Sequence, residues 1–469
     1  MTRKIAILGA GPVGLGAAYR LQELGYRDFT VYDRNSYLGG LAASFSDSAG
    51  FTYDIGGHVM FSHYKYFDNL FDRMLGDEYT ELMRESWIWM ASRWIPYPLQ
   101  NNIRHLPQNL LDECVQGLRD AQSLDPKATA NFAQWVEAQF GAGIARHFMR
   151  PYNFKVWAHP LEVMSKEWIA ERVSVIDLER VLANIREERD ELSWGPNNTF
   201  KYPLYGGTGG LYARFWPLLR DHLQLNREVV GVDLSARLLR FADGGEAEYD
   251  VLISAAPIPE LLSMISPAPE RLIEAARGLH HTNGLVVGVG IDRPCETTKC
   301  WTYFPESDCP FYRVTFLSNY SPNMAPPGHT LLLTETSYSE HKAVDRHAIV
   351  DDVVEGLIAT QLISPEDRSR IVATHTTEVE HFYPVPTLDR DAALAEIQPW
   401  LMANDIYSRG RFGAWRYEIS NMDHSVMQGV EVVDSLLLGQ PEQTWSTIER
   451  PRPAPVTVDE PQLDVASRR

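Results

Sequence analysis

A glycine-rich run near the N-terminus, residues 9–14 with the sequence Gly-Ala-Gly-Pro-Val-Gly, constrains the fold of this chain more than any other feature. It follows a short apolar run and opens a segment that places Val13, Ala17 and Leu21 on one helical face. In a strand–turn–helix unit, such glycines allow a tight turn and a close approach of the backbone to a pyrophosphate, whose charge the helix N-terminus holds. The pattern therefore predicts a dinucleotide-binding unit.

The residues that follow extend this pattern. A second short strand, residues 29–32, ends at Asp33, which is placed to accept hydrogen bonds from an adenosine ribose. A plain turn residue at a strand end is the alternative interpretation of Asp33. The diglycine Gly39-Gly40 comes next. This arrangement resembles FAD proteins of the amine-oxidase and glutathione-reductase type more than NAD dehydrogenases.

Composition limits the classes of function. The chain has 469 residues, of which 44% are hydrophobic and 22% charged, as in ordinary globular proteins of two or three lobes. The formal net charge of −19 argues against non-specific binding of nucleic acid or of anionic membranes. No signal peptide and no apolar stretch of membrane-spanning length is apparent, so we expect a cytoplasmic protein without membrane insertion. The cysteines, at 114, 295, 300 and 309, lack metal-ligand spacing, so we expect reduced thiols and no metal.

Hydrophobic periodicity gives a coarse map of the elements. Helical spacing recurs within residues 103–190, including an amphipathic run at 177–192. Runs rich in β-formers occur at 282–291, 313–320 and 330–336. A buried-type strand is predicted at 250–256, and a last strand, a glycine-arginine turn and a closing helix are predicted within 405–438.

Arginine and aromatic residues gather in several short clusters. Arginine gives bidentate contacts to a diphosphate, and tyrosine supplies a stacking face and a hydroxyl, so together they suit a nucleotide sugar. For each cluster alone, the alternative is a half-buried aromatic ring with a surface arginine stacked on it. The clusters are residues 93–100, 150–157, 301–303, 311–313 and 409–417.

From about residue 4 to residue 440, the chain resembles the UDP-galactopyranose mutases, in particular their eukaryotic-type branch. The most specific motifs are Gly-Gly-His-Val-Met-Phe-Ser-His-Tyr-Lys-Tyr at 56–66, the run at 150–157, Asp-Cys-Pro-Phe-Tyr-Arg at 308–313 and Ser-Arg-Gly-Arg-Phe-Gly at 408–413. The resemblance implies an α/β fold with a Rossmann-like FAD-binding domain, a helical domain and an antiparallel β-sheet domain.

The resemblance also implies how the chain is divided among these domains. The FAD-binding domain would be formed by residues 1–75, by 191–279 together with sheet-domain segments, and by 396–440. The sheet domain would comprise 76–102 and 280–395, and the helical domain 103–190. Composition predicts that the tail, 451–469, is disordered.

Roles carried over from the family fall on particular residues. His58 would pass the flavin ring near N5, with a satisfied loop histidine as the alternative, and Arg172 and Arg313 would clamp the diphosphate. The remaining cofactor residues would be Gly9, Gly11, Gly14, Asp33, Gly39, Gly40, Gly57, Arg411 and Asn421. The substrate residues would be Tyr97, Gln100, Phe148, Asn153, Trp157, Asn197, Trp301, Tyr303, Tyr320, Tyr383 and Tyr417. Arg84 and Ser86 match positions that receive NADPH.

The implied reaction interconverts UDP-galactopyranose and UDP-galactofuranose without net redox change. NADPH would reduce FAD, and N5 of the reduced flavin would attack the anomeric carbon. Three alternatives stay open: a mutase of another nucleoside diphosphate sugar, a flavin amine-oxidase-like oxidoreductase, and a flavin-binding regulatory protein. Two departures from the family pattern bear on them. Leu99 stands where a second aromatic face is expected, which leaves the nucleobase open, and the short connection at 319–331 leaves the oligomeric state open, a homo-oligomer included.

Overall fold

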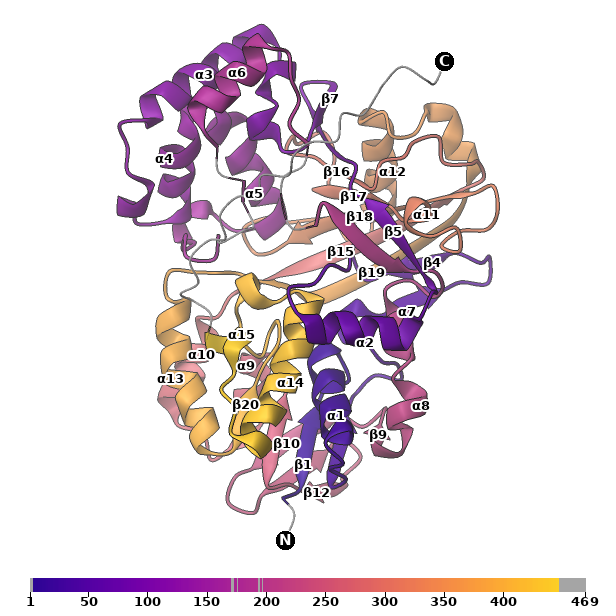
Figure 1. Cartoon of the computed structure of the whole chain (residues 1–469), viewed down its shortest axis with the longest axis vertical. Helices are drawn as coiled ribbons and strands as arrows, with labels where there is room; N and C mark the ends of the chain where they lie inside the picture. The colour runs from indigo at the N-terminus through magenta and orange to yellow at the C-terminus, as the bar shows by residue number, and fades with distance from the viewer. Residues whose placement is uncertain (1–2, 170–172, 175, 193–194, 196, 447–469) are drawn as a thin grey trace.

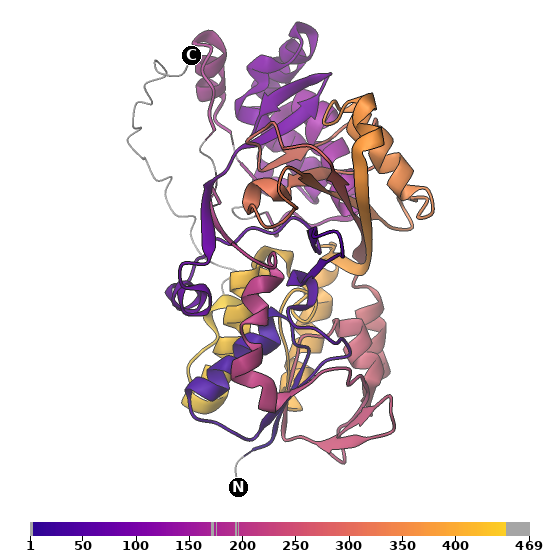
Figure 2. The same ribbon diagram turned by 90° about the vertical axis from the view of Figure 1, so that its right-hand side faces the viewer.

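The computed structural model describes residues 3–169, 173–174, 176–192, 195 and 197–446. Figure 1 shows a lower lobe that contains α1, α14 and the first strand, a helical lobe at the upper left, and a long twisted sheet between and to the right of them. Figure 2 shows the same layers from the side. The chain enters the lower lobe at its N-terminus and returns to it twice. Arg172 and the tail from 451 lie outside the described residues.

The lower lobe is built on a parallel sheet of five strands, in the order β20-β13-β1-β2-β9. In β1, Ile5 and Ile7 face one hydrophobic cluster while Ala6 and Leu8 face another, because successive side chains of a strand point to opposite faces. Both faces are therefore buried, as parallel sheets require. The strands are β1 (Ile5–Leu8), β2 (Phe29–Tyr32), β9 (Leu223–Gln224), β13 (Val251–Ser254) and β20 (Ile406–Ser408).

Two helices, α1 (Pro12–Glu23) and α14 (Met422–Leu438), pack closely on one face of this sheet. A Cβ atom on Gly14 would lie 1.8 Å from the carbonyl oxygen of Gly9, so only glycine fits between helix and strand. A Cβ on Gly429 of α14 would lie 2.1 Å from the carbonyl oxygen of Val13. The strand–turn–helix–strand unit predicted from the sequence is confirmed.

The opposite face of the parallel sheet is covered by a small second sheet and three helices. Their apolar side chains share one hydrophobic cluster with Ala6 and Leu8. The small sheet has the order β12-β11-β10-β14. These elements are β10 (Val229–Asp233), β11 (Leu238–Phe241), β12 (Glu246–Glu248), β14 (Ile265–Ser266), α9 (Ile258–Met264), α10 (Glu270–Arg277) and α13 (Arg390–Ala403).

The upper sheet has seven strands, in the order β19-β15-β18-β17-β16-β6-β7. It is antiparallel except for one parallel pair, β6 with β16, where the segment expected at 76–102 joins the strands that follow residue 280. The strand expected at 313–320 is confirmed only as far as Phe316. Residues Leu317–Tyr320 form α11 instead, in which the side chains of Leu317 and Tyr320 are buried. The strands are β6 (Ser86–Met90), β7 (Arg93–Pro96), β15 (His281–Ile291), β16 (Trp301–Tyr303), β17 (Arg313–Phe316), β18 (Thr330–Tyr338) and β19 (Ile371–Pro384).

The helical lobe contains the helices predicted within 103–190. The run at 177–192 is helical only as far as Arg186, and Glu188 then adopts a left-handed φ of 51° because the charged stretch offers no apolar face to bury. The helices are α3 (Gln108–Ala121), α4 (Phe132–Ile144), a π-helix (Ala145–Met149), α5 (Arg150–Trp157) and α6 (Leu178–Arg186).

Shorter elements connect these layers. The further strands are β3 (Ser44–Ser46), β4 (Thr52–Asp54), β5 (Tyr79–Met83) and β8 (Thr199–Pro203). The further helices are α2 (Lys65–Leu75), α7 (Gly209–Ala213), α8 (Trp216–Leu219), α12 (Ile349–Ala359) and α15 (Gln443–Ser446). All four cysteines are free thiols. Among the described residues, no helix combines the length and apolar character needed to cross a membrane.

Candidate functional site

A cavity of about 830 Å³ opens at the carboxyl ends of the parallel strands. Leu8, Gly9 and Gly11 line it where β1 passes into α1. The rest of its wall comes from segments at 12–13, 32–37, 40–45, 55–58, 228–230, 255–264 and 377–381 and from the turn and helix start at 410–425. This is the place where open α/β sheets bind ligands.

Asp33 and the glycines shape one end of this cavity. The Asp33 carboxylate is mostly buried and accepts hydrogen bonds from the backbone N–H groups of Ala10, at 2.6 Å, and Asn35, at 2.7 Å. It thereby fastens the glycine turn to the end of β2. Gly9 adopts a φ of 105°, which favours glycine. Of the nine predicted cofactor residues, Gly9, Gly11, Asp33, Gly40 and Arg411 line this cavity.

A second, smaller cavity of about 260 Å³ adjoins the first. Both cavities are lined by Leu41, Ile55, His58, Arg411 and Met422, which places their junction at these side chains. The smaller cavity is also lined by predicted site residues from several elements: Gly57, Tyr97, Asn197, Tyr303, Arg313, Tyr383, Tyr417 and Asn421. Segments far apart in the sequence therefore converge here.

An ion pair between neighbouring strands forms the floor of the smaller cavity. Arg313 of β17 and Glu335 of β18 are register partners. The Arg313 guanidinium donates to both Glu335 carboxylate oxygens, from Nη2 at 2.8 Å and from Nε. Glu335 is 1% exposed and also accepts from the Tyr312 hydroxyl at 3.2 Å. The bidentate pair orients the guanidinium and compensates its charge. Glu335 was not among the site residues predicted from the sequence.

The loop at 56–58 lies directly over this ion pair. A Cβ on Gly57 would lie 2.3 Å from Oγ1 of Thr315 and 3.3 Å from Oε2 of Glu335, so this residue must be glycine. Nδ1 of His58 is buried and has no hydrogen-bond partner among the residues that the structure describes. Burial, with smaller contributions from the Arg411 and Arg313 charges, lowers the pKa of His58 to about 3. The imidazole is therefore neutral near neutral pH and offers an unused ring nitrogen at the junction.

Aromatic rings form one wall of the smaller cavity. The rings of Tyr97 and Tyr303 lie 5.3 Å apart, and Nε1 of Trp301 donates to the Tyr303 hydroxyl at 2.6 Å. The Arg84 guanidinium lies over the Tyr97 ring at 5.1 Å and donates to Oδ1 of Asn197 at 2.8 Å. Burial raises the pKa of both tyrosines, so both stay protonated as hydrogen-bond donors.

The segment at 409–421 carries Arg411, Tyr417 and Asn421 to the two cavities. Arg390 of α13 is 2% exposed and pairs with both carboxylate oxygens of Glu418, at 2.9 and 3.0 Å. Arg411 lies over the Tyr383 ring at 5.5 Å. This buried ion pair thus anchors the segment at 409–421 to α13.

Several predicted site residues lie outside the linings of both cavities. Gln100 and Asn153 donate instead to backbone carbonyls, those of Ser174 at 3.0 Å and Met149 at 2.7 Å. Leu99 is 1% exposed and packs in the core of the helical lobe. The full set is Gly14, Gly39, Arg84, Ser86, Gln100, Phe148, Asn153, Trp157, Trp301 and Tyr320. The predicted clamp residue Arg172 lies outside the described residues.

A further polar group at the start of α14 was also missed. Oδ2 of Asp423 lies 2.7 Å from Nδ1 of His63 and accepts from the His63 backbone N–H at 3.0 Å. His424 contributes a second imidazole, with Nδ1 at 3.3 Å from Oδ1 of Asp423. These contacts fasten the end of the loop that carries His58 to the first turn of α14. The motif at 56–66 gave the only signal for them.

Comparisons with known proteins give consistent results. The family model described as flavin containing amine oxidoreductase matches residues 14–415. A crystal structure of reduced UDP-galactopyranose mutase superimposes with a TM-score of 0.93 and 44% identity, covering 96% of this chain and 97% of that one. A putative protoporphyrinogen oxidase from Exiguobacterium sp. 255-15 has a TM-score of 0.72 at 16% identity, with 94% and 100% of the chains covered, which shows the fold alone.

A more distant relative is a desaturase by name. The 15-cis-phytoene desaturase of Arabidopsis thaliana is 26% identical over 343 residues, which are 65% of this chain. The match spans 57% of the desaturase, little more than half of its length.

Proposed function

Because this chain belongs to the flavin-containing amine oxidoreductases and, among them, to the UDP-galactopyranose mutases, we propose that it binds FAD and interconverts UDP-galactopyranose and UDP-galactofuranose. The observation that carries this proposal is the junction of the two cavities at His58 and Arg411. The larger cavity, with the glycine turn and Asp33, meets there a smaller cavity lined by tyrosines and Arg313. These hydroxyl and guanidinium donors suit a diphosphate, which an amine substrate does not carry.

The residues of the larger cavity fit FAD. The glycine turn and the N-terminus of α1 would hold the pyrophosphate, and Asp33 would accept the ribose hydroxyls. The unpartnered Nδ1 of His58 and the N-terminus of α14 at Asn421 would face the flavin ring. Arg411 and the positive end of the α14 dipole would favour an anionic reduced flavin.

When bound and reduced, FAD supplies N5 as the nucleophile for the anomeric carbon of the sugar. Arg313 would bind the diphosphate as it leaves and hold it for the return step, since a charge-assisted contact orients and stabilises phosphate oxygens. Tyr303, Tyr383 and Tyr417 would donate hydroxyl hydrogen bonds to the same group. The neutral His58 would accept or donate a hydrogen bond at Nδ1, according to its tautomer, without adding a second positive charge.

NADPH is proposed as the reductant. Arg84 lies at the edge of the smaller cavity, held over Tyr97 and against Asn197, where its guanidinium could meet a phosphate of NADPH when Asn197 moves. Ser86 follows on β6 and is buried in this structure. The cytoplasmic location and the oligomeric state stay predictions of the sequence.

The test is to incubate the protein, reduced either chemically or by NADPH, with UDP-galactofuranose and other nucleoside diphosphate sugars, to separate the products by chromatography, and to follow NADPH in the second case. We expect a pyranose product from UDP-galactofuranose and far less NADPH consumed than product formed. Consumption of one NADPH or one O₂ for each product would identify an oxidoreductase instead. A protein that takes up no flavin would contradict the proposal altogether.

A further inference from the structure

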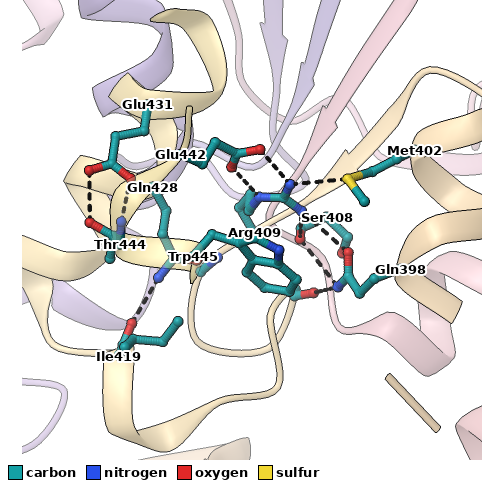
Figure 3. A network of polar contacts seen from close by, with 12 residues as sticks. Gln398, Met402, Ser408, Arg409, Ile419, Gln428, Glu431, Glu442, Thr444 and Trp445 are labelled. Carbon is teal, nitrogen blue, oxygen red and sulfur yellow. Dashed lines mark hydrogen bonds and ion pairs between the residues drawn. The ribbon is translucent and has the colours of Figure 1, made fainter. Parts of the chain in front are cut away.

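A short segment after α14, residues 441–445, folds back onto the lower lobe, and we call it the C-terminal clasp. Its Glu442 faces Arg409, a residue that is fully buried at the end of β20 (Figure 3). Nε of Arg409 donates to Oε2 of Glu442 at 2.6 Å and Nη2 donates to Oε1 at 2.7 Å. The Arg409 side chain itself is 0% exposed and that of Glu442 is 10% exposed.

Two more residues of the clasp make specific contacts. Thr444 donates from its backbone N–H to Glu431 of α14 at 2.7 Å, and its hydroxyl lies 2.9 Å from the second Glu431 oxygen, as Figure 3 shows. The indole ring of Trp445 lies 4.3 Å from the Arg409 guanidinium and 4.8 Å from that of Arg416. Glu442 and Trp445 thus join the clasp to the segment that begins at Arg409, and Thr444 joins it to α14.

The clasp contacts the ends of the two segments that meet at the cavity junction. Arg409 is two residues before Arg411, and the intervening Gly410 donates its backbone N–H to Oε1 of Gln428 at 2.8 Å. On the other side, the hydroxyls of Thr444 and Tyr64 lie 2.9 Å apart, and Tyr64 ends the loop that carries His58. One segment therefore braces both the turn that carries Arg411 and the loop that carries His58.

We propose that the C-terminal clasp positions Arg411 and His58 at the flavin, so that Glu442, Thr444 and Trp445 are positioning residues for the cofactor. The inference rests on the proposed function, because it assumes that FAD occupies the larger cavity. Two sites that stabilise each other are linked reciprocally, so loss of the clasp weakens FAD binding and loss of FAD loosens the clasp.

The experiment compares Glu442→Gln and Thr444→Val in the full-length holoprotein. Thr444→Val keeps the shape and the buried Arg409–Glu442 pair, so it stays informative if Glu442→Gln does not fold. Coupling between two sites typically changes the affinity at one of them by a factor of about 5 to 150. We expect the Kd for FAD to rise by a factor in this range in both variants. The midpoint potential of the bound flavin falls because Arg411 is held less firmly. Hydrogen exchange at 441–445 slows when FAD is added to the wild-type protein.

The matched control is Asp434→Asn, on α14. The Asp434 carboxylate accepts from Nε of Arg20 at 2.7 Å, and among the described residues it forms no hydrogen bond to the turn or the loop, so we expect this variant to lose stability without a change in flavin affinity. If Thr444→Val and Glu442→Gln behave like Asp434→Asn, with the wild-type Kd and potential, the clasp is packing alone and the inference is wrong. A wild-type protein that takes up no FAD would overturn the proposed function as well.

Discussion

The larger cavity is lined at its phosphate end by glycines and backbone amides from one continuous stretch of chain, whereas the smaller cavity is lined by tyrosine, arginine and glutamate side chains from many segments. Asp33 and the glycine turn lie within about 25 residues of each other. Arg313, Glu335, Tyr383 and Tyr417 come from four separate segments of the chain. The larger cavity therefore depends at this end on local backbone geometry, and the smaller one on buried charge and on register between strands.

The largest expected effect separates folding of the chain from FAD binding in the larger cavity. Gly14→Ala should prevent formation of a folded holoprotein, because its Cβ would lie 1.8 Å from the Gly9 carbonyl oxygen. Gly11→Ala should fold, since the nearest atoms to its Cβ beyond its chain neighbours would be those of Gly39 and Gly40 at 3.9 Å, yet it should lose FAD because Gly11 lines the cavity. Soluble yield and flavin absorbance measure the two effects. Gly278→Ala is the control, because its Cβ would lie at an ordinary contact distance of 3.4 Å from the carbonyl oxygen of Ala275. A Gly14→Ala protein that folds and binds flavin would contradict the prediction.

The next effect tests the buried charges of the smaller cavity. Arg313→Ala leaves Glu335 buried without its partner, and breaking such a pair costs about 3–5 kcal/mol. We therefore expect a lower free energy of unfolding together with a loss of kcat/KM. Adding Glu335→Gln to Arg313→Ala removes the unpaired charge and should restore much of the stability but none of the activity. Denaturant unfolding and kcat/KM with UDP-galactofuranose measure this, and full activity in the double variant would remove Arg313 from the site.

A smaller effect distinguishes tyrosines inside and outside the smaller cavity. Tyr417 lines it, whereas Tyr320 packs against Phe200 and Tyr202 behind it. Tyr417→Phe should lower kcat/KM about ten- to a hundredfold, since a hydrogen bond to a charged group contributes about 1.5–3 kcal/mol. Tyr320→Phe should leave kcat/KM nearly unchanged, contrary to the role that the resemblance implies for it. A larger loss in Tyr320→Phe than in Tyr417→Phe would reverse this assignment.

The same difference explains what the sequence could predict. The unit from β1 to Asp33 is local, so glycine spacing and apolar runs were sufficient to predict it. Glu335 could not be found in this way, because its role depends on lying opposite Arg313 in the register of β17 and β18. The second half of the strand predicted at 313–320 was wrong for a related reason, since burial of Leu317 and Tyr320 in α11 overrode the β propensity of this segment. Family motifs supplied most of the residues that line the smaller cavity, but not the ion pairs that hold them.

The effect that is smallest at neutral pH, and appears only in acid, concerns His58, which lies where the two cavities meet. Its pKa is lowered from 6.5 to about 3, mainly by burial and further by Arg411 and Arg313, so the unfolded chain binds more protons than the folded protein between these pH values. The stabilisation is complete above pH 6.5 and is lost as the pH falls through about 3. At saturating FAD, the free energy of unfolding of the wild type should therefore fall more steeply between these pH values than that of His58→Gln. Parallel curves would mean that His58 is solvated and that the junction is open, so that the two cavities would no longer form one site.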